Sequence, residues 1–213
     1  EKTGFSEEQA ARILRYECFD NALMDGFCDK IATAHHLDDN VETVLFNLFR
    51  GSALSGVCGI SETAKDGKIV RPLLNCSRAQ IEEYVKKHDL PFVTDETNEC
   101  TNYSRNFIRK ELLPLINERF NGSSNAINRF SKLALQDDLL LNSLASELIH
   151  GNEVDFTDEA HLPLFNRACL KVMQSLGITK DFESAHLLAI YSLKDLQTGK
   201  RIQLKQGVCA YKS

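Results

Sequence analysis

Long apolar runs are missing from this chain of 213 residues, and so are closely paired cysteines. The apolar stretches are only a few residues long, whereas a membrane-spanning helix needs about 20 predominantly apolar residues. The seven cysteines are scattered and form no CxxC pair, which indicates reduced thiols rather than a disulfide or zinc framework. The first ten residues also lack a secretion-signal pattern. We therefore expect a cytoplasmic protein with no membrane partner.

The net charge of -5 is unlike that of a typical nucleic-acid-binding protein, but the charge is unevenly distributed. Residues 101–132 contain six Lys or Arg against two Glu, a net of +4, whereas residues 133–159 contain seven acids and no Lys or Arg. A basic stretch in an acidic chain is compatible with a local phosphate-binding surface. It is equally compatible with a solvated helix face, and both interpretations stay open.

Helical and strand-like patterns alternate over the first 93 residues. Two capping-box pairs, Ser6 with Gln9 and Ser77 with Gln80, mark helix starts, and Gly51 marks a helix end. The pattern predicts helices over 6–23, over 41–49 and after Ser77, with short strands over 30–34, 69–74 and 91–93. This alternation is typical of a wound α/β sheet.

The pattern becomes mainly helical after about residue 100. We expect a polar loop over 98–105, a helix that is broken or ends near Pro114, and a turn at 121–124. A long amphipathic helix should run from 125 to about 148 and be closed by Gly151. Two more helices, over 161–176 and 182–194, and a hairpin of 202–204 with 208–211 complete the prediction.

The densest group of chemically active side chains lies between the first strand and the second helix. His35, His36, Asp38, Asp39 and Glu42 fall within eight residues. Ligands of open α/β sheets bind at the carboxyl ends of strands, and two imidazoles with three carboxylates can hold Mg²⁺, orient a cationic amine or move a proton. Zinc is less suitable because the carboxylates are hard ligands and no cysteine is near. The simpler alternative is helix capping by one of the two aspartates beside a hydrogen-bonded histidine.

The segment AHHLDDNVET at 34–43, followed by Arg50-Gly51, closely resembles the signature of tRNA(Ile)-lysidine synthetases, which are N-type ATP pyrophosphatases. Residues 125–213 resemble the helical substrate-side domain of that family more loosely. Further matches to family motifs are ARILRY at 11–16, RPLL at 71–74, DETN at 95–98 and YSRNFIR at 103–109. The resemblance implies part of a doubly wound parallel sheet of the adenine nucleotide alpha-hydrolase type in residues 1–118, and a mainly helical domain in 119–213.

The resemblance also implies a reaction in two steps. ATP adenylates C2 of the wobble cytidine in tRNA(Ile) with a CAU anticodon and releases pyrophosphate. The ε-amine of L-lysine then displaces AMP. The departing pyrophosphate needs Mg²⁺ and cationic side chains, and the lysine amine must lose a proton before it attacks.

The resemblance also implies roles for three groups of residues, according to their positions in the family motifs. The catalytic group, which stabilises phosphate charge or lies at the reacting centre, consists of Arg15, His35 and Asp39. The group assigned to substrate or metal, with Asp38 as the residue that would reach Mg²⁺, consists of His36, Asp38 and Glu42. The group assigned to tRNA phosphate or to support of the fold consists of Arg105, Asn106 and Arg109. An ordinary surface or interdomain salt bridge is the alternative for the two arginines of the last group.

Two features of the family have no counterpart in the sequence. No SGGxDS loop, which would surround ATP phosphates with backbone N–H groups, is found, and the family's C-terminal domain is absent. The glycines at 51 and 56 suggest a phosphate loop, but the Lys-Ser or Lys-Thr pair of a Walker A motif does not follow. We therefore expect a central fragment that forms little or no lysidine alone. Its oligomeric state is open, with a homodimer as one option.

Three other functions remain as alternatives. A sister ATP pyrophosphatase such as a tRNA thiolase would use the same scaffold, but those enzymes commonly carry CxxC pairs or a persulfide cysteine. A nonenzymatic tRNA-binding module would use the basic stretch and leave the histidine–carboxylate group without a task. A metal-dependent hydrolase would use HHxDD as its ligands.

Overall fold

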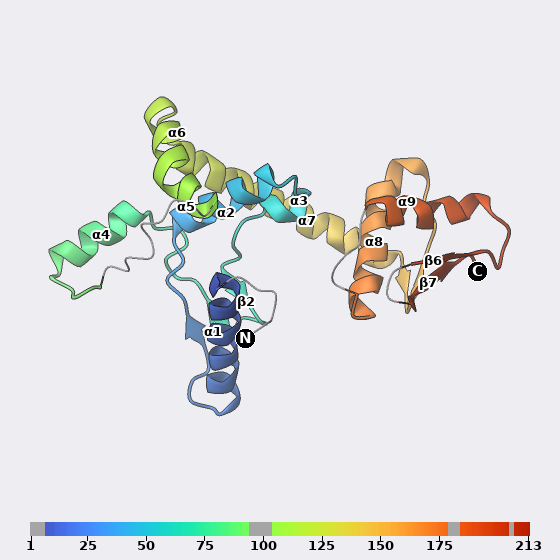
Figure 1. Ribbon diagram of the computed structural model, residues 1–213, viewed down its shortest axis with the longest axis horizontal. Coiled ribbons are helices and arrows are strands. Elements are labelled where there is room, and N and C mark those ends of the chain that lie inside the picture. The colour runs from blue at the N-terminus through green and yellow to red at the C-terminus, as the bar shows by residue number, and fades with distance from the viewer. Residues whose placement is uncertain (1–6, 94–103, 179–183, 205–206) are drawn as a thin grey trace. The chain divides into compact units, whose positions relative to one another are not determined.

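The computed structural model describes residues 7–93, 104–178, 184–204 and 207–213 (Figure 1). The chain divides into two compact units, Glu1–Leu135 and Gln136–Ser213. The predicted functional boundary after residue 118 lies inside the first unit and stays a prediction. Within the described ranges, no helix is both long and apolar enough to cross a membrane.

A small mixed sheet organises the first unit. β1 (Ile31–Ala32) pairs in parallel with β3 (Ile69–Val70), and β2 (Thr63–Ala64) pairs antiparallel with the other edge of β3. The helix α1 (Glu7–Met24) precedes β1, and α2 (Leu37–Phe49) follows it. The chain thus returns to a parallel neighbour after a helical crossover, which confirms the predicted α/β class.

The strands are shorter than the sequence pattern predicts. After β3 the chain turns at once, with Leu74 N–H donating to the Arg71 carbonyl, so the predicted strand over 69–74 ends at Val70. The strand predicted at 91–93 is wrong. Phe92 and Val93 are 77% and 95% exposed and in no regular element, because no described strand lies beside them to supply hydrogen bonds.

The helix after Ser77 agrees with its capping signal. α4 (Arg78–Lys87) begins with a capping box in which the Ser77 side chain accepts from Gln80 N–H, and the Gln80 side chain accepts from Ser77 N–H. Satisfying two of the free N–H groups of the first turn fixes where the helix starts.

The helix predicted to be broken or to end near Pro114 does not end there; a π-helical turn interrupts its α-helical geometry just before Pro114. α5 (Ser104–Phe107), the π-helical turn η2 (Ile108–Leu112) and α6 (Leu113–Arg119) follow one another without a gap. Pro114 lies in the first turn of α6, directly after the π-helical turn, and the chain stays helical through it. The wide π-helical turn before it carries Arg109, a residue of the site described below.

The helix α2 is the centre of the first unit's core. On one side Leu37, Val41 and Leu45 pack against Ile108 and Leu113 of the π turn and α6. Because α2 is fixed against η2 on this side, side chains at the boundary between them have defined positions.

The other side of α2 packs on α3 (Leu54–Val57) and on the first half of α7 (Ser123–Glu147) through Val44, Val57 and Ala134. One turn away, Asn40 is 3% exposed, and both its amide nitrogen and its amide oxygen have hydrogen-bond partners. Its Nδ2 donates to Asn128 Oδ1 and Ser131 Oγ, and its Oδ1 accepts from Ile60 N–H at 2.6 Å. A buried amide with all these partners fixes the position of α2 against α7.

The second unit has its own core around Phe165, which is 1% exposed. The two helices and the final hairpin predicted here are confirmed, whereas a first hairpin, with Gly151 in its turn, replaces the simple helix end that was expected. The remaining elements are β4 (Ile149–His150), β5 (Glu153–Val154), the 3-10 turns at Glu159–His161 and Leu193–Asp195, α8 (Leu162–Ser175), α9 (Ser184–Ser192), β6 (Arg201–Gln203) and β7 (Cys209–Tyr211).

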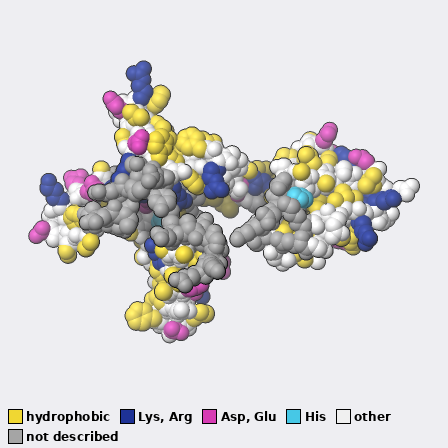
Figure 2. All heavy atoms as spheres, viewed as in Figure 1, with side chains coloured by type: hydrophobic (Ala, Val, Ile, Leu, Met, Phe, Trp, Pro, Cys, Tyr) yellow, Lys and Arg dark blue, Asp and Glu magenta, His cyan; other side chains and the backbone are white. Residues whose placement is uncertain are grey.

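Hydrophobic side chains reach the surface of the first unit in several places, including α6 and the end of α1 (Figure 2). Leu115 on α6 and Phe120 just after it are 64% and 66% exposed. Met24 at the end of α1 and Phe27 shortly after it are 75% and 87% exposed. Singly exposed apolar side chains are normal, so these positions alone assign no binding surface.

Candidate functional site

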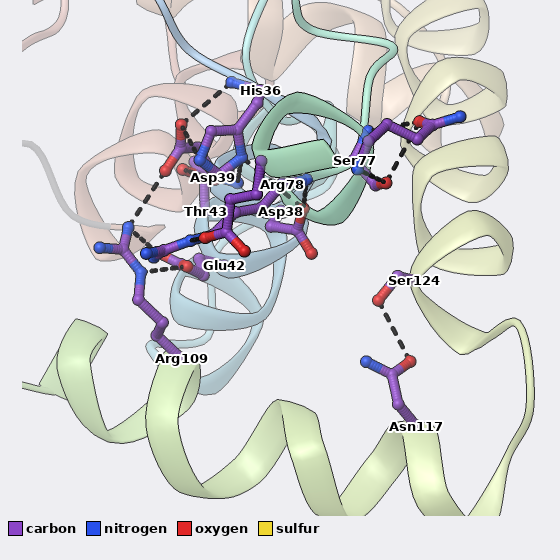
Figure 3. A network of polar contacts seen from close by, with 12 residues as sticks. His36, Asp38, Asp39, Glu42, Thr43, Ser77, Arg78, Arg109, Asn117 and Ser124 are labelled. Atoms are coloured by element: carbon purple, nitrogen blue, oxygen red, sulfur yellow. Dashed lines mark hydrogen bonds and ion pairs between the residues drawn. The ribbon is translucent and has the colours of Figure 1, made fainter. Parts of the chain in front are cut away.

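The main polar network of the first unit joins α2 to the π-helical turn (Figure 3). Arg109 donates from Nε to Glu42 Oε1 at 2.6 Å and from Nη2 to Glu42 Oε2 at 2.9 Å. Its Nη2 also donates to Asp39 Oδ1 at 3.1 Å. Asp39 and Glu42 lie three residues apart on one helix face, as predicted, so one guanidinium reaches both carboxylates.

Burial controls the ionisation of this network. The side chain of Glu42 is 5% exposed, and this burial raises the pKa of Glu42, while the hydrogen bond and charge of Arg109 oppose the rise. The hydrogen bond to Glu42 in turn raises the pKa of Arg109. Arg109 is therefore a permanent cation between two carboxylates. When both carboxylates are ionised the trio carries one net negative charge, which favours a second cation such as an amine.

His36, not either aspartate, is the N-cap of α2. Its Nδ1 accepts from Asp39 N–H at 3.4 Å, and Asp39 Oδ2 accepts from His36 N–H at 3.0 Å, which completes a capping box. Of the two aspartates predicted to cap this helix, Asp39 accepts a backbone N–H as the third helical residue, but the N-cap position itself belongs to His36. An unprotonated imidazole nitrogen can accept a backbone N–H as a carboxylate does. Asp39 at the third helical position completes the capping box by accepting the N–H of His36. Asp39 thus uses one carboxylate oxygen for the cap and the other for Arg109.

Asp38 points to a different helix. Its Oδ2 accepts from Arg78 N–H at 2.7 Å, at the first residue of α4. A carboxylate at a helix N-terminus is stabilised by the N–H groups that lack partners there and by the helix dipole. Asp38 consequently fixes the start of α4 near the site, and only indirectly takes part in the Arg109 network.

His35 lies just past the end of β1 and is half-buried. Its Nδ1 is 2.9 Å from Thr33 Oγ1. Burial lowers the pKa of His35, and the positive charge of Arg71 lowers it further, whereas Asp39 acts in the opposite direction. Arg12 and Arg15 of α1 add smaller effects that also lower the pKa. A neutral imidazole at neutral pH can accept a proton from a substrate.

Arg71 is a residue of the candidate site to which the sequence analysis gave no role, although it lies in the RPLL motif. Its Nη1 donates to the Ser61 carbonyl at 2.6 Å, while its Nε is buried with no hydrogen-bond partner in the described part of the chain. Because β1 and β3 are parallel, the residues that follow both strands emerge at the same sheet edge. That rule, applied to His35 and Arg71 together, would have placed them near one another.

Arg105 and Asn106 lie on α5, one turn before Arg109. The Arg105 guanidinium lies 5.4 Å from the ring centre of Phe46 on α2, in the range of a cation–π contact. Asn106 is half-buried. The structure therefore brings Asp39, Glu42 and Arg109 into one network, with Arg105 beside it.

The remaining predicted residues lie in three settings. His36 belongs to the network as its helix cap, and Asp38 belongs to the start of α4. Arg15 is exposed on α1 and affects His35 electrostatically.

No group of three or more His, Cys, Asp or Glu side chains that could hold a metal ion is found among the described residues. The donor chemistry gives the reason. Both oxygens of Glu42 and one of Asp39 accept from Arg109, and the other oxygen of Asp39 accepts from a backbone N–H. Carboxylates engaged in this way do not fit a directly bound Mg²⁺, which needs oxygens free of competing cations.

Comparison with known proteins gives a consistent result. The family model described as the PP-loop domain matches residues 1–116. The tRNA(Ile)-lysidine synthase of Chlorobaculum tepidum is 47% identical over 115 residues, which are 54% of this chain and 34% of that protein. The tRNA(Ile)-lysidine synthase of Caldanaerobacter subterraneus subsp. tengcongensis is 34% identical over 223 residues, covering 99% of this chain and 47% of that protein. The chain therefore spans less than half the length of these relatives.

Among solved structures, the U34-tRNA thiolase NcsA of Methanococcus maripaludis, solved with its iron–sulfur cluster, is similar to this chain. Its TM-score is 0.50 at 17% identity, and the match covers 63% of this chain and 46% of the thiolase. At this identity the likeness concerns the fold alone, and it agrees with the predicted adenine nucleotide alpha-hydrolase type.

Proposed function

Because the chain belongs to the PP-loop domain family and is homologous to tRNA(Ile)-lysidine synthases, as its motifs predicted, we propose that it serves lysidine formation. In this reaction ATP adenylates C2 of the wobble cytidine of tRNA(Ile) with a CAU anticodon, and the ε-amine of lysine displaces AMP. The reaction would take place in the cytoplasm. The observation that carries the proposal is the pair Asp39–Glu42 held on one helix face by Arg109.

The carboxylate pair suits the recognition of lysine. Lysine brings an ammonium group to a site with two carboxylates and one guanidinium, and so restores charge balance there. Asp39 is the more accessible partner, since its side chain is 21% exposed against 5% for Glu42. We expect Asp39 to contact the ammonium group, while Glu42 holds Arg109, whose remaining N–H groups suit the carboxylate of lysine.

His35 is suited to the proton transfer. The attacking amine of lysine loses a proton as its nitrogen bonds to C2 and the bond from C2 to the AMP oxygen breaks. An imidazole that burial keeps neutral can take this proton. His35 is therefore the residue that we propose as general base, close enough to Asp39 for their charges to interact.

The arginines around His35 suit the phosphates of ATP. Membership of the PP-loop domain family implies use of ATP. Arg15 is exposed, and Arg71 has a buried Nε without a hydrogen-bond partner among the described residues, so both have donors to offer an anion. We propose that they stabilise negative charge as pyrophosphate and later AMP depart.

Mg²⁺ is expected with ATP rather than on the carboxylates of the network. Magnesium in nucleotide enzymes is commonly held by substrate phosphates with one or two carboxylates. Asp38 is the residue predicted for this role, but its Oδ2 already accepts the N–H of Arg78. No step proposed here depends on the ligands of the metal.

A segment exchange tests the proposal directly. The stretch of the Caldanaerobacter synthase that matches this chain is replaced by residues 1–213, and incorporation of radiolabelled lysine into a tRNA(Ile) transcript is measured with ATP and Mg²⁺. We expect the exchanged enzyme to form lysidine, and Asp39→Asn in it to raise the KM for lysine at least about tenfold, the effect of losing one charge-assisted hydrogen bond. Asp137→Asn, an exposed acid on α7, is the matched control and should leave KM unchanged.

The same experiment distinguishes the alternatives. A folded exchanged enzyme that binds the tRNA but neither consumes ATP nor incorporates lysine would support a binding module and refute the proposal. Transfer of sulfur would support a thiolase, although the sequence has no CxxC pair. We expect residues 1–213 alone, which have no SGGxDS loop, to form little or no lysidine.

A further inference from the structure

A hollow in the surface of the first unit lies one helical turn away from the carboxylate pair. It encloses about 440 Å³ and is lined by α2, by α5 and by the first residue of η2. Figure 1 shows α5 lying beside α2, and the two elements are in contact. We call it the phenylalanine hollow, and its lining residues are Phe46, Phe49, Arg50, Ser104, Phe107 and Ile108.

Two arginines make cation–π contacts with the ring of Phe46. The guanidinium carbon of Arg50 lies 5.3 Å from the ring centre, and that of Arg105 lies 5.4 Å from it. A guanidinium that stacks on an aromatic ring keeps its edge N–H groups available for a phosphate. Phe46 therefore positions two phosphate-binding groups at the phenylalanine hollow.

The other rings of the hollow face solvent. Phe49 is 63% exposed and Phe107 is 46% exposed, so both present aromatic surface that the described residues leave uncovered. No carboxylate is among the lining side chains, and the rim charge is positive. Aromatic rings beside arginines are the surface on which unpaired bases of single-stranded RNA stack, with the backbone phosphates on the cations. An apolar side chain of a protein would gain nothing from the two arginines.

The place of the hollow relative to the site sets which base it would hold. Phe46 follows Glu42 by four residues on α2, and Arg105 precedes Arg109 by four residues. Four residues of helix advance about 6 Å, which is comparable to the step between neighbouring nucleotides in an unstacked strand. A base in the hollow would thus lie about one nucleotide step from the carboxylate pair Asp39 and Glu42.

We propose that the phenylalanine hollow binds an unstacked nucleobase of the anticodon loop adjacent to the cytidine that is modified. Phe49 and Phe107 stack on the base, and Arg50 and Arg105 hold the phosphates beside it. The choice of the anticodon loop rests on the function proposed above, whereas the preference for single-stranded RNA rests on the hollow itself.

Binding of RNA without ATP or lysine tests the inference. The probe is an anticodon stem-loop RNA with 2-aminopurine beside the wobble cytidine, whose fluorescence is quenched on stacking. We expect residues 1–213 to bind and quench it, and Phe107→Leu or Phe49→Leu to weaken binding about tenfold and to relieve the quenching. Arg50→Gln should lower the dependence of log Kd on log salt by about 0.7, the effect of one lost phosphate contact on a single strand.

Matched controls separate the hollow from the general surface. Arg119→Gln at the end of α6 and Phe120→Leu just after it, both at exposed positions, should bind and quench as the unaltered chain does. Absence of RNA binding, or equal binding and quenching by both phenylalanine variants when circular dichroism shows them folded, overturns the inference. If the exchanged enzyme forms no lysidine and the quenching still depends on Phe49 and Phe107, the result supports RNA binding at the hollow and refutes the proposed function. If lysidine forms and the quenching is unchanged by substitution of Phe49 and Phe107, only the proposal about the phenylalanine hollow is refuted.

Discussion

Arg109 binds Glu42 through two parallel hydrogen bonds of 2.6 and 2.9 Å, across 67 positions of sequence. The fork joins the helix that follows β1 to the π-helical turn, and it neutralises a carboxylate whose side chain is 5% exposed. Bidentate pairing fixes orientation as well as distance, so the same contact determines where Asp39 and Glu42 present their remaining charge. Structure and proposed lysine recognition depend on this one pair.

Removing Arg109 should destabilise the first unit strongly. Arg109→Ala leaves Glu42 buried without its cation, and we expect the free energy of unfolding to fall by about 2–3 kcal/mol, less than for a fully buried pair because Arg109 is 30% exposed. Urea denaturation measures the change. The double variant Arg109→Ala/Glu42→Gln should recover most of it, since the buried charge is gone. As a control, Arg78→Ala breaks an exposed pair with Glu82 and should cost below about 0.5 kcal/mol.

Asn40 and Gly59 should show strong coupling. A Cβ on Gly59 would lie 2.1 Å from Asn40 Oδ1, and Gly59 has a φ of +74°. Gly59→Ala should therefore destabilise the chain through both a clash and backbone strain. Asn40→Ala removes the buried hydrogen bonds to α7 and should cost about 2–3 kcal/mol.

The double variant Asn40→Ala/Gly59→Ala measures that coupling. In the absence of the Asn40 side chain, Gly59→Ala should cost only its backbone strain, about 1 kcal/mol. Additive losses in urea denaturation would show that the two residues do not interact.

Folding stability should depend on pH through His35. Burial and nearby arginines lower the pKa of His35 in the folded chain, so the folded state resists its protonation. The stabilising contribution is complete above the unfolded pKa of about 6.5 and is lost as the pH falls through the lower folded pKa. Comparison of unfolding free energies between pH 7.5 and 5 should show a steeper decline for the unaltered chain than for His35→Gln. Parallel curves for the two proteins would contradict this assignment.

Arg71 should control the pKa of His35. Arg71→Gln removes the largest electrostatic effect that opposes protonation, and the pKa of His35 should move upward toward its ordinary value. Titration of the imidazole by NMR measures the shift. Arg119→Gln, on α6, is the matched loss of one positive charge and should leave the His35 titration unchanged. A fall in the pKa after Arg71→Gln would refute the electrostatic explanation.

Local signals in the sequence predicted the elements that depend on neighbouring residues. The capping pair Ser77–Gln80 located the start of α4, and the helical spacing from Val41 to Phe49 located most of α2. The density of His35 to Glu42 pointed to the candidate site, in which His36, Asp39 and Glu42 share the start and one face of α2. These features are set within four residues of sequence, where pattern and structure are most closely linked.

Features that depend on distant partners were not predictable in the same way. A histidine is an uncommon helix cap, so the role of His36 is visible only with Asp39 in place opposite it. Arg71 approaches His35 because two strands pair in parallel, and Arg109 reaches Glu42 because α2 packs on η2. The exposed segment at 91–93 has the composition of a strand but no described neighbour, and composition alone supplies no hydrogen-bond partner.

The π-helical turn Ile108–Leu112 bears on how the site could arise and be retained. Such a turn is equivalent to a single residue inserted into an α-helix, and it is locally less favourable than the regular helix. Deleting one residue there would improve the helix while rotating Arg109 by about 100° relative to the residues that follow. The segment with one residue deleted would thus form a more regular helix, but its Arg109 would no longer be oriented toward Glu42. We expect selection to act against insertions and deletions in this segment as strongly as against substitutions.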